Sequence, residues 1–463
     1  MGWKCAADRG VTVRKSLTDK PPPVEPRLNQ RRAGSDTTHL VTQVRRYELI
    51  TPLFGGGVEP GTADFITVIR GSGIRGHMRF WWRACCGGQF KGDLRAMKRA
   101  EDRLWGAASI AGNPSPSQVQ IQVEINESGN LVHPYVVVAG KPGKDGKPRP
   151  RLQAKETVAP AYAAFPLQPS EAEIRTRGNG METKGVVEKV RFTLTIIFPQ
   201  SERGEVEAAL WAWETLGGIG ARTRRGFGAL RNLDASLPPA NTVHQFVQNG
   251  LQQYVTEGAW PVGVPHLVRS PRMKITAVHP NARLVWEHLI KRLKDFRQKR
   301  PGPPNDPGRT VWPEPDAVRR LTGQHLDKGV NGETVRHQPV HSAGNKFPRA
   351  VFGLPIIFHF KDMNRSNLID PTADPRDTTL RGKDHDRFSS PLILRPLACA
   401  NGQAVGVGLI LEGTGIENLP GGLILKGAPG DPTVHAVLEP HEATAIAPLG
   451  GNSDVLEAFM KTL

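Results

Sequence analysis

The strongest regular pattern in this chain is a β-strand followed directly by an amphipathic helix. Residues 186–198 are rich in β-branched and apolar side chains, which predicts a strand. Residues 202–216 then place apolar side chains at helical spacing, and Gly217 and Gly218 stand where helices usually end. Other strand-like and helix-like segments follow without regular βαβ alternation. This mixture favours an α+β fold over a doubly wound parallel sheet.

The same criteria predict the other elements. We expect strands at residues 42–50, 65–69, 119–125, 132–138, 273–278, 350–360, 391–397 and 404–411. We expect helices at residues 72–85, 94–105, 243–255 and 282–296, and a short one from Asp454. A turn at residues 127–130 contains Gly129, so strands 119–125 and 132–138 are predicted to form a hairpin.

The length of the chain predicts two domains, because 463 residues exceed what one hydrophobic core usually organises. Residues 1–38 are polar, basic and broken by prolines, so we expect a disordered basic tail. We place the first domain at residues 39–236 and the second at residues 237–463. A Pro-rich linker is expected at residues 300–307.

The charge balance indicates a polyanionic partner. Lys and Arg number 61 against 44 Asp and Glu, which gives a net charge of +17. Nucleic acid fits this charge, although a basic surface can also serve solubility alone. The charge by itself therefore leaves the partner open.

Cysteine usage and hydropathy indicate the redox state of the thiols, the absence of a metal site and the cellular location. The four cysteines lack CxxC or zinc-ligand spacing: Cys5, Cys85, Cys86 and Cys399. We therefore expect reduced thiols, no metal and no cofactor. No run reaches about 20 apolar residues, and the amino terminus lacks a signal-like apolar core, so the expected location is cytoplasmic.

A first basic motif at residues 70–83 reads RGSGIRGHMRFWWR and leads from a strand into a helix. Glycines at its opening let backbone amides approach an anion, and the first helical turn carries partial positive charge. Three arginines recur every four residues: Arg75, Arg79 and Arg83. Without interleaved acidic residues, this row is predicted to contact successive phosphates. The aromatic residues 80–82 are expected to pack in the core rather than stack on bases.

The same motif satisfies the dinucleotide-binding pattern GxGxxG through Gly71, Gly73 and Gly76. That fingerprint requires a βαβ unit with an acidic residue at the end of the next strand, about 20 residues on. Here a helix-like segment follows at residues 94–105, and Asp93 has no strand before it. We therefore reject a Rossmann-type site.

A second motif at residues 217–228 reads GGIGARTRRGFG, with five glycines, three arginines and no acidic residue. We expect that it packs little core and lays amides and guanidinium groups along a phosphate chain; a flexible surface loop is the alternative. Residues 141–151, KPGKDGKPRPR, are expected to form a solvated loop, with an RNA-touching insertion as the alternative.

These motifs resemble the RAMP superfamily, whose members have ferredoxin-like (RRM-like) domains and a Gly-rich loop near the carboxyl end of the domain. Residues 217–228 look like that loop. ITPLFGGG at residues 50–57 and IRGSGIRGHMRFWWR at residues 69–83 look like the family of first subunits of Cmr complexes in type III-B CRISPR systems. FPRAVFGLPI at residues 347–356 and FSSPLILRP at residues 388–396 are similar to the second half of that family.

The resemblance implies two ferredoxin-like domains with Gly-rich loops and insertions. It also implies a non-catalytic, cytoplasmic RNA-binding subunit of an antiviral ribonucleoprotein, which grips guide RNA near its 3′ end, helps capture target RNA and contacts other Cmr subunits. No membrane partner is expected. The residues expected to bind RNA are Arg70, Ser72, Arg75, Arg79, Arg83, Gly218, Gly220, Arg222, Arg224, Arg225, Gly226, Arg349, Arg387 and Arg395.

The main rival hypothesis is a metal-independent endoribonuclease of the same superfamily, using Asp64 or His77. A lone Asp in a Gly-rich loop is more often a turn residue, and a lone helical His is more often packed or solvated. A ribosomal or structural RNA-binding protein would share the charge but not the motifs. We therefore expect no catalytic residues.

Overall fold

The computed structural model describes residues 39–55, 64, 67–110, 113–142, 148–303, 308–327, 337–360 and 371–463. Leu40–Leu463 is one compact unit. The tail predicted at residues 1–38 lies outside the described residues, as do residues 65–66 of a predicted strand and residues 304–307 of the predicted linker.

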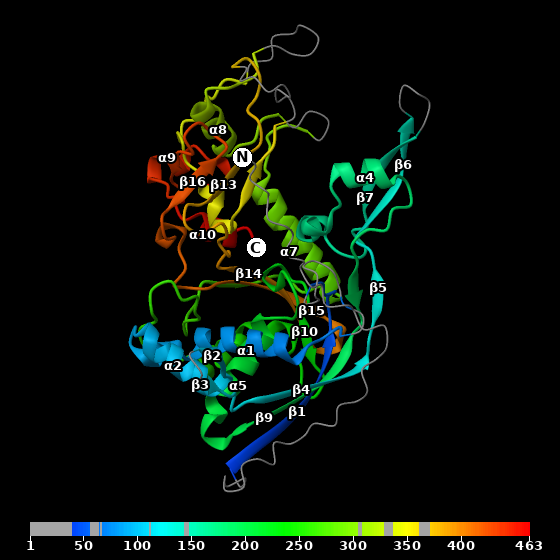
Figure 1. Cartoon of the computed structure of the whole chain (residues 1–463), viewed down its shortest axis with the longest axis vertical. Helices are drawn as coiled ribbons and strands as arrows, with labels where there is room; N and C mark the ends of the chain where they lie inside the picture. Colours follow the sequence, from blue (N-terminus) through cyan, green and yellow to red (C-terminus); the bar gives the residue numbers. More distant parts are fainter. Residues whose placement is uncertain are drawn as a thin grey trace, which may run out of the picture. The chain divides into compact units, whose positions relative to one another are not determined.

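A four-stranded antiparallel sheet organises the first half of the chain (Figure 1). Its strands lie in the order β10 (Leu230–Asn232), β1 (Leu40–Leu49), β9 (Arg191–Pro199) and β4 (Gln120–Glu127). Two helices pack on one face: α1 (Gly71–Cys86) and α5 (Arg203–Leu216). Along the chain these six elements run β–α–β–β–α–β, with further elements inserted between α1 and β9.

Side-chain alternation explains why the helices cover this face. In β9 every second residue is buried: Phe192, Leu194, Ile196 and Phe198. An apolar stripe on α1 is buried as well, at Ile74, Met78, Trp81 and Cys85. The predicted core face and the predicted end of α5 are both confirmed, because the Trp213 indole donates to the Gly218 carbonyl at 2.8 Å just beyond the helix.

A second, three-stranded antiparallel sheet lies in the second half of the chain. Its order is β11 (Met273–Ile275), β15 (Ala404–Ile410) and β14 (Leu392–Ala398). Every residue of β14 and β15 is buried, so these two strands are covered on both faces.

The two faces of β14 belong to different cores. Ile393 and Leu397 join the core of the first sheet. Leu392 and Leu394 instead pack with the helices α7 (Ala282–Arg297) and α10 (Val455–Met460). The two halves of the chain thus share buried apolar surface, and the boundary predicted near residue 237 stays a prediction.

The remaining strands form one larger and three small antiparallel sheets. The larger one has the order β12 (Ile356–Phe358), β13 (Thr378–Gly382), β16 (Leu423–Lys426) and β17 (Thr433–Val434). The pairs are β2 (Ala107–Ile110) with β3 (Asn113–Ser115), β5 (Asn130–Val132) with β8 (Val186–Glu188), and β6 (Tyr135–Pro142) with β7 (Pro148–Ala154).

The other helices are α2 (Leu94–Trp105), α3 (Ala161–Ala164), α4 (Glu171–Arg177), α6 (Val243–Tyr254), α8 (Glu314–Thr322) and α9 (Pro440–Thr444). The helices predicted at residues 94–105, 243–255 and 282–296 are thereby confirmed. Asp93 caps α2 by accepting from the amides of Arg95 and Ala96, which agrees with rejecting a strand before it. Within the described residues, no helix combines the length and apolarity needed to cross a membrane.

Some strands and strand pairings differ from those predicted from local sequence patterns. Residues 119–125 and 132–138 form no hairpin, because β4 pairs with β9 while β5 and β6 pair with β8 and β7. Residues 141–151, predicted as a solvated loop, supply parts of both β6 and β7, with residues 143–147 outside the described residues. Residues 67–69 are a bend rather than a strand.

Two helical glycines allow a matched test of this packing. A Cβ at Gly250 in α6 would lie 2.2 Å from Cε2 of Trp211, whereas nothing lies within 4 Å of a Cβ at Gly204 in α5. We expect Gly250→Ala to lower the free energy of unfolding by about 1–3 kcal/mol through overpacking. Gly204→Ala should leave it unchanged or raise it by up to about 1 kcal/mol. Urea denaturation of both variants measures the difference, and equal effects would contradict the α5–α6 packing.

Candidate nucleic-acid interface

The glycine-rich loop at residues 217–228 packs inside the protein. Phe227 is fully buried, and its ring contacts Phe54 and Trp286 edge to face, with centroids 4.8 and 4.7 Å away. Ile219 is buried as well. The expectation that this segment contributes little core is therefore wrong, because Ile219 joins the core of the first sheet and Phe227 enters an aromatic cluster built by distant parts of the chain.

Its glycines serve close packing. Gly226 has φ +81°, and a Cβ there would lie 2.6 Å from Cδ1 of Trp286. A Cβ at Gly218 would lie 2.7 Å from the Gly228 carbonyl, and one at Gly220 would lie 2.7 Å from the Phe54 carbonyl. Backbone crowding thus explains the glycines predicted to bind RNA.

The segment at residues 50–55 holds this loop in place. The Thr51 hydroxyl donates to the Gly226 carbonyl at 2.7 Å and accepts from the Ala229 amide at 2.9 Å. Further along, the Gly228 amide donates to the Pro52 carbonyl and the Ala221 amide to the Phe54 carbonyl, each at 2.8 Å. These loop amides are committed within the fold, so side chains must supply most of any contact with an anion.

Two loop arginines bind main-chain carbonyls of the second half. Arg225 donates to the Leu392 carbonyl at 2.7 Å and to the Phe352 carbonyl at 3.1 Å. Arg224 donates to the Ser390 carbonyl at 2.5 Å, and its guanidinium lies 5.2 Å from the Phe80 ring centroid. The loop therefore joins the two segments that resemble the second half of the family, residues 347–356 and 388–396.

Three more arginines surround these two. Arg222 is exposed and donates to the Ala163 carbonyl at 2.8 Å. Arg297, at the end of α7, donates to the Tyr162 hydroxyl at 2.8 Å, and Arg349 donates to the Arg297 carbonyl at 3.0 Å. We call these five residues the arginine cluster: Arg222, Arg224, Arg225, Arg297 and Arg349.

Positive charge in the arginine cluster is poorly compensated, because carbonyl oxygens are neutral acceptors. In the part of the chain that the structure describes, Glu314 is the one carboxylate paired with the cluster, 3.1 Å from Arg349. Burial, followed by repulsion from Arg297, Arg222 and Arg224, lowers the pKa of Arg225 to about 9. Burial also lowers the pKa of Arg224 to about 10. Five cations against one anion create a site at which an added anion is stabilised.

The arginine row of α1 behaves differently. Arg79 and Arg83 both pair with Glu101, a residue of α2 that is 2% exposed; the Arg79 Nε lies 2.7 Å from its carboxylate. Arg70 pairs with Asp64. The expectation of a row without acidic partners is therefore wrong, because the partner comes from the next helix. Within the described residues, Arg75 donates to the Trp105 carbonyl alone, at 3.5 Å.

The remaining predicted positions fall into three environments. Trp81 and Trp82 are buried, which confirms core packing for this aromatic pair. Ser72 and Arg387 are exposed. Arg395 is fully buried and donates to the Leu230 carbonyl at 2.8 Å, so it cannot contact RNA in this fold.

Arg297 is the cluster member that sequence reasoning missed. It belongs to a basic stretch at the end of α7, where Lys294, Lys299 and Arg300 also occur, and that run was a usable signal. Nothing local distinguishes Arg297 from its basic neighbours, because its contacts with Tyr162 and the Phe352 ring come from distant segments.

The residues of the rival nuclease hypothesis have ordinary structural roles. Asp64 pairs with Arg70 and accepts from the Thr67 amide at 3.2 Å. Burial lowers the pKa of His77 to about 4, so its ring is neutral at pH 7. Among the described residues, no group of three or more His, Cys, Asp or Glu side chains could hold a metal ion.

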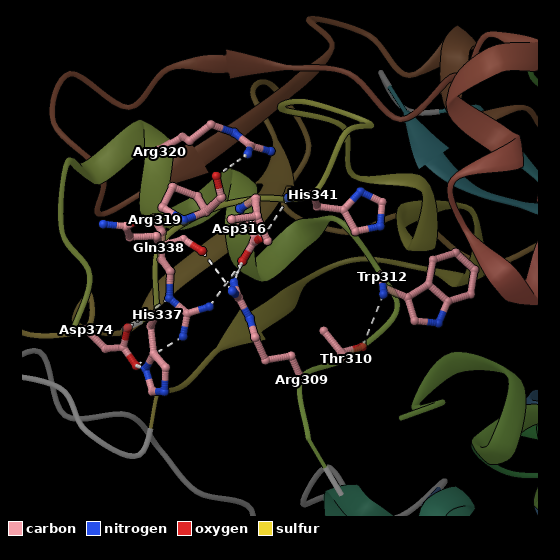
Figure 2. Close-up of polar contacts among 12 residues, drawn as sticks. Arg309, Thr310, Trp312, Asp316, Arg319, Arg320, His337, Gln338, His341 and Asp374 are labelled. Carbon is pink, nitrogen blue, oxygen red and sulfur yellow. Dashed lines mark hydrogen bonds and ion pairs between the residues drawn. The ribbon is translucent and has the colours of Figure 1, made fainter. Parts of the chain in front are cut away.

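A second arginine-containing network, around α8, provides a contrast (Figure 2). Arg319 donates to Asp374 at 2.8 Å and to Asp316 at 3.3 Å, and Asp316 also pairs with Arg309. His337 lies 2.8 Å from Asp374. Burial opposes ionisation of Asp374, but the hydrogen bond and charge of Arg319 hold its pKa below the usual value. Here buried carboxylates balance the cations, so the network stabilises the fold and offers no anion site.

Comparison with known proteins finds similarity to one family over part of the chain. Residues 46–231, which contain α1, Glu101 and the glycine-rich loop, match the RAMP superfamily. The chain is 28% identical over 187 residues to the CRISPR system Cmr subunit Cmr1-2 of Pyrococcus furiosus, covering 40% of this chain and 91% of that relative.

Solved structures of low sequence identity are also similar to this chain. The crystal structure of apo Cmr1 from Pyrococcus furiosus has a TM-score of 0.43 and 16% identity, covering 81% of this chain and 89% of that one. A chain of a type III-B Cmr-β complex with cognate target RNA and AMPPnP has a TM-score of 0.44 and 13% identity, covering 92% and 98%.

The shared carboxylate of the α1 row gives a prediction about stability. Glu101→Gln leaves Arg79 and Arg83 without their buried partner and should lower the free energy of unfolding by about 1–3 kcal/mol. Glu171→Gln, which breaks the exposed pair with Arg175, should change it by less than about 0.5 kcal/mol. Denaturant titrations of the two variants measure the contrast, and a Glu101→Gln protein as stable as wild type would contradict a structural role for the pair.

Proposed function

We propose that this chain is a RAMP-superfamily protein and a non-catalytic RNA-binding subunit of a cytoplasmic type III-B CRISPR ribonucleoprotein in antiviral defence. It would grip guide RNA near its 3′ end and help capture target RNA beside other Cmr subunits. The match of residues 46–231 to the RAMP superfamily and the similarity to a Cmr1 subunit support this proposal. The observation that carries it is the excess positive charge of the arginine cluster.

The arginine cluster is suited to phosphate. A guanidinium has five N–H donors, and the carbonyl contacts of Arg222, Arg224 and Arg225 use only part of them. The same contacts fix the orientation of each planar group before an anion binds. Phosphate oxygens then accept paired N–H bonds that are stronger than neutral ones. Such contacts position a nucleic-acid backbone without reading its sequence.

The proposed site differs in part from the sequence-based one. It keeps Arg222, Arg224, Arg225 and Arg349, and it adds Arg297. The exposed Arg387 remains a candidate at its edge. In the first motif, Arg70, Arg79 and Arg83 are occupied by carboxylates, so we assign the main contacts to the cluster.

We further propose that residues 39–236 form a ferredoxin-like domain. The β–α–β–β–α–β order and the strand order β10–β1–β9–β4 support this assignment. For residues 237–463 we propose a second domain of the same kind, supported by a sheet of β11, β15 and β14 that α7 backs. Under this proposal the arginine cluster draws its residues from both domains.

Charge removal at the cluster tests the RNA site. Arg222→Gln with Arg297→Gln removes two cations whose hydrogen bonds go to neutral oxygens, and it leaves the carbonyl anchors of Arg224 and Arg225. Binding of single-stranded RNA should weaken by about 1–2 kcal/mol per site, and the salt slope should fall by about one unit per lost contact. Fluorescence anisotropy across a salt series measures both quantities.

The matched control is Lys274→Gln with Lys426→Gln, which removes the same charge from exposed residues of the second half. It should change RNA affinity much less. Equal losses in the two double variants would mean that overall charge attracts the RNA and that the cluster has no special role.

Absence of catalysis gives a separate prediction. Asp64→Ala and His77→Ala should leave target-RNA cleavage by a reconstituted complex unchanged, because neither side chain is proposed to transfer a proton. The measurement is cleavage of labelled target RNA over time. If the isolated chain cuts RNA without metal, and either substitution abolishes cutting while binding survives, the nuclease hypothesis replaces ours.

A further inference from the structure

The outer face of α2 carries a basic row outside both sequence motifs. Three of its arginines follow one another at four-residue spacing: Arg95, Arg99 and Arg103. All three are exposed, with 62% of the Arg103 side chain accessible. Lys91, four residues before Arg95, is exposed too. One α-helical turn separates successive arginines, so they lie about 6 Å apart along the helix axis.

Nearby carboxylates leave this row largely unneutralised. Among the described residues, Arg95 and Arg99 form no ion pair, and Arg103 lies 3.8 Å from Glu202. Asp93 caps the helix, and its charge acts on Arg95 and Arg99 without forming an ion pair with either. Asp102 pairs with Lys98 and Arg79. Glu101 points the other way, toward the arginines of α1. The helix therefore directs its buried carboxylate inward and its arginines outward.

Folding alone does not account for this arrangement. Like charges at i and i+4 on a helix destabilise it, whereas one acidic residue between them would stabilise it. The buried face of α2 already docks through Met97, Leu104 and Trp105, so the outer arginines are not required for packing. A row that opposes helix stability and is exposed to solvent is suited to a ligand outside the chain.

We propose that the outer face of α2 is a second phosphate-binding surface, which holds a stretch of single-stranded RNA backbone at Arg95, Arg99 and Arg103. This inference rests on the proposed RNA-binding function and extends it to an element that the arginine cluster does not include. The α2 row supplies arginine, which binds phosphate through paired N–H bonds.

Nucleic acid fits this face better than an acidic protein surface. The centre of a protein–protein interface is depleted of charged residues and enriched in aromatic ones. On the outer face of α2 the exposed apolar side chain is Leu94, and the aromatic Trp105 is buried on the opposite face. A regular cation row without an apolar centre matches a phosphate backbone, which is a regular row of anions.

The test uses the full chain with Arg95→Gln, Arg99→Gln and Arg103→Gln combined, because glutamine keeps helix propensity and removes the charge. The control combines Lys274→Gln, Lys426→Gln and Lys461→Gln, three exposed residues of the second half. Fluorescein-labelled single-stranded RNA is titrated across a salt series. We expect the α2 variant to bind roughly tenfold more weakly and to lose about one unit of salt slope per contact, beyond the control.

Parallel measurements separate this inference from the proposed function. If the Arg222→Gln, Arg297→Gln variant binds like wild type while the α2 variant is impaired, the cluster proposal fails and the α2 surface stands. An α2 variant no weaker than its control overturns the α2 surface, even if the cluster variant is impaired. The α2 surface is also overturned if the α2 variant keeps its RNA binding but loses binding to poly-L-glutamate, since the row would then recognise acidic protein.

Thermal unfolding and a charge-preserving variant test whether weaker RNA binding results from misfolding. Removing three like charges should leave the melting temperature unchanged or slightly higher. If it falls, Arg95→Lys, Arg99→Lys and Arg103→Lys combined should keep the salt slope and lose only part of the RNA affinity, because an ammonium group keeps the charge but not the paired N–H bonds. A folded lysine variant that loses salt slope as the glutamine variant does would overturn phosphate recognition by this row.

Discussion

The packing of Phe227 and Arg225 against the second half is the interaction on which the rest of this structure depends. Phe227 fills a site between Phe54 and Trp286, and Arg225 donates to the carbonyls of Leu392 and Phe352. The Trp286 indole N–H in turn donates a hydrogen bond to the Arg225 carbonyl at 2.7 Å. This loop conformation needs glycine at position 226, where a Cβ would meet the Trp286 ring. The segments that resemble the family thus converge on one loop and constrain one another.

That packing has an electrostatic consequence. Arginines anchored by carbonyls keep their positive charge, and burial makes that charge more costly than it would be in water. Around Asp374 the same cost is offset internally, because Arg319 meets buried carboxylates at hydrogen-bond distance. Around Arg225 the cost of the buried charge is not offset in this way, apart from the contact of Glu314 with Arg349. In our proposal, an RNA phosphate would balance the positive charge around Arg225, as Asp374 balances that of Arg319.

The sequence predicted the longer helices α1, α2, α5, α6 and α7 well, because they depend on local periodicity, and it missed the shorter helices α3, α4, α8 and α9. The stripe on α1 and the alternation of β9 carry their own signal. Strand partners could not be predicted in the same way, because β4 pairs with β9, which lies about 70 residues later in the chain. The continuous apolar runs of β14 and β15 indicated strands, but not that the two faces of β14 serve different cores. A division of the chain by sequence therefore crosses a shared core.

The candidate site shows the same limit more sharply, since a row of arginines has the same spacing whether or not it is paired. On α1 the row lies in the recognised motif, yet Glu101 neutralises its last two members. On α2 the row lies outside every motif and faces solvent with little compensation. Both outcomes follow from one fact: Glu101 can face only one side of its helix. Turning it toward α1 secures the α1–α2 packing and leaves the opposite face of α2 basic, so the fold itself determines which arginines remain available to an anion.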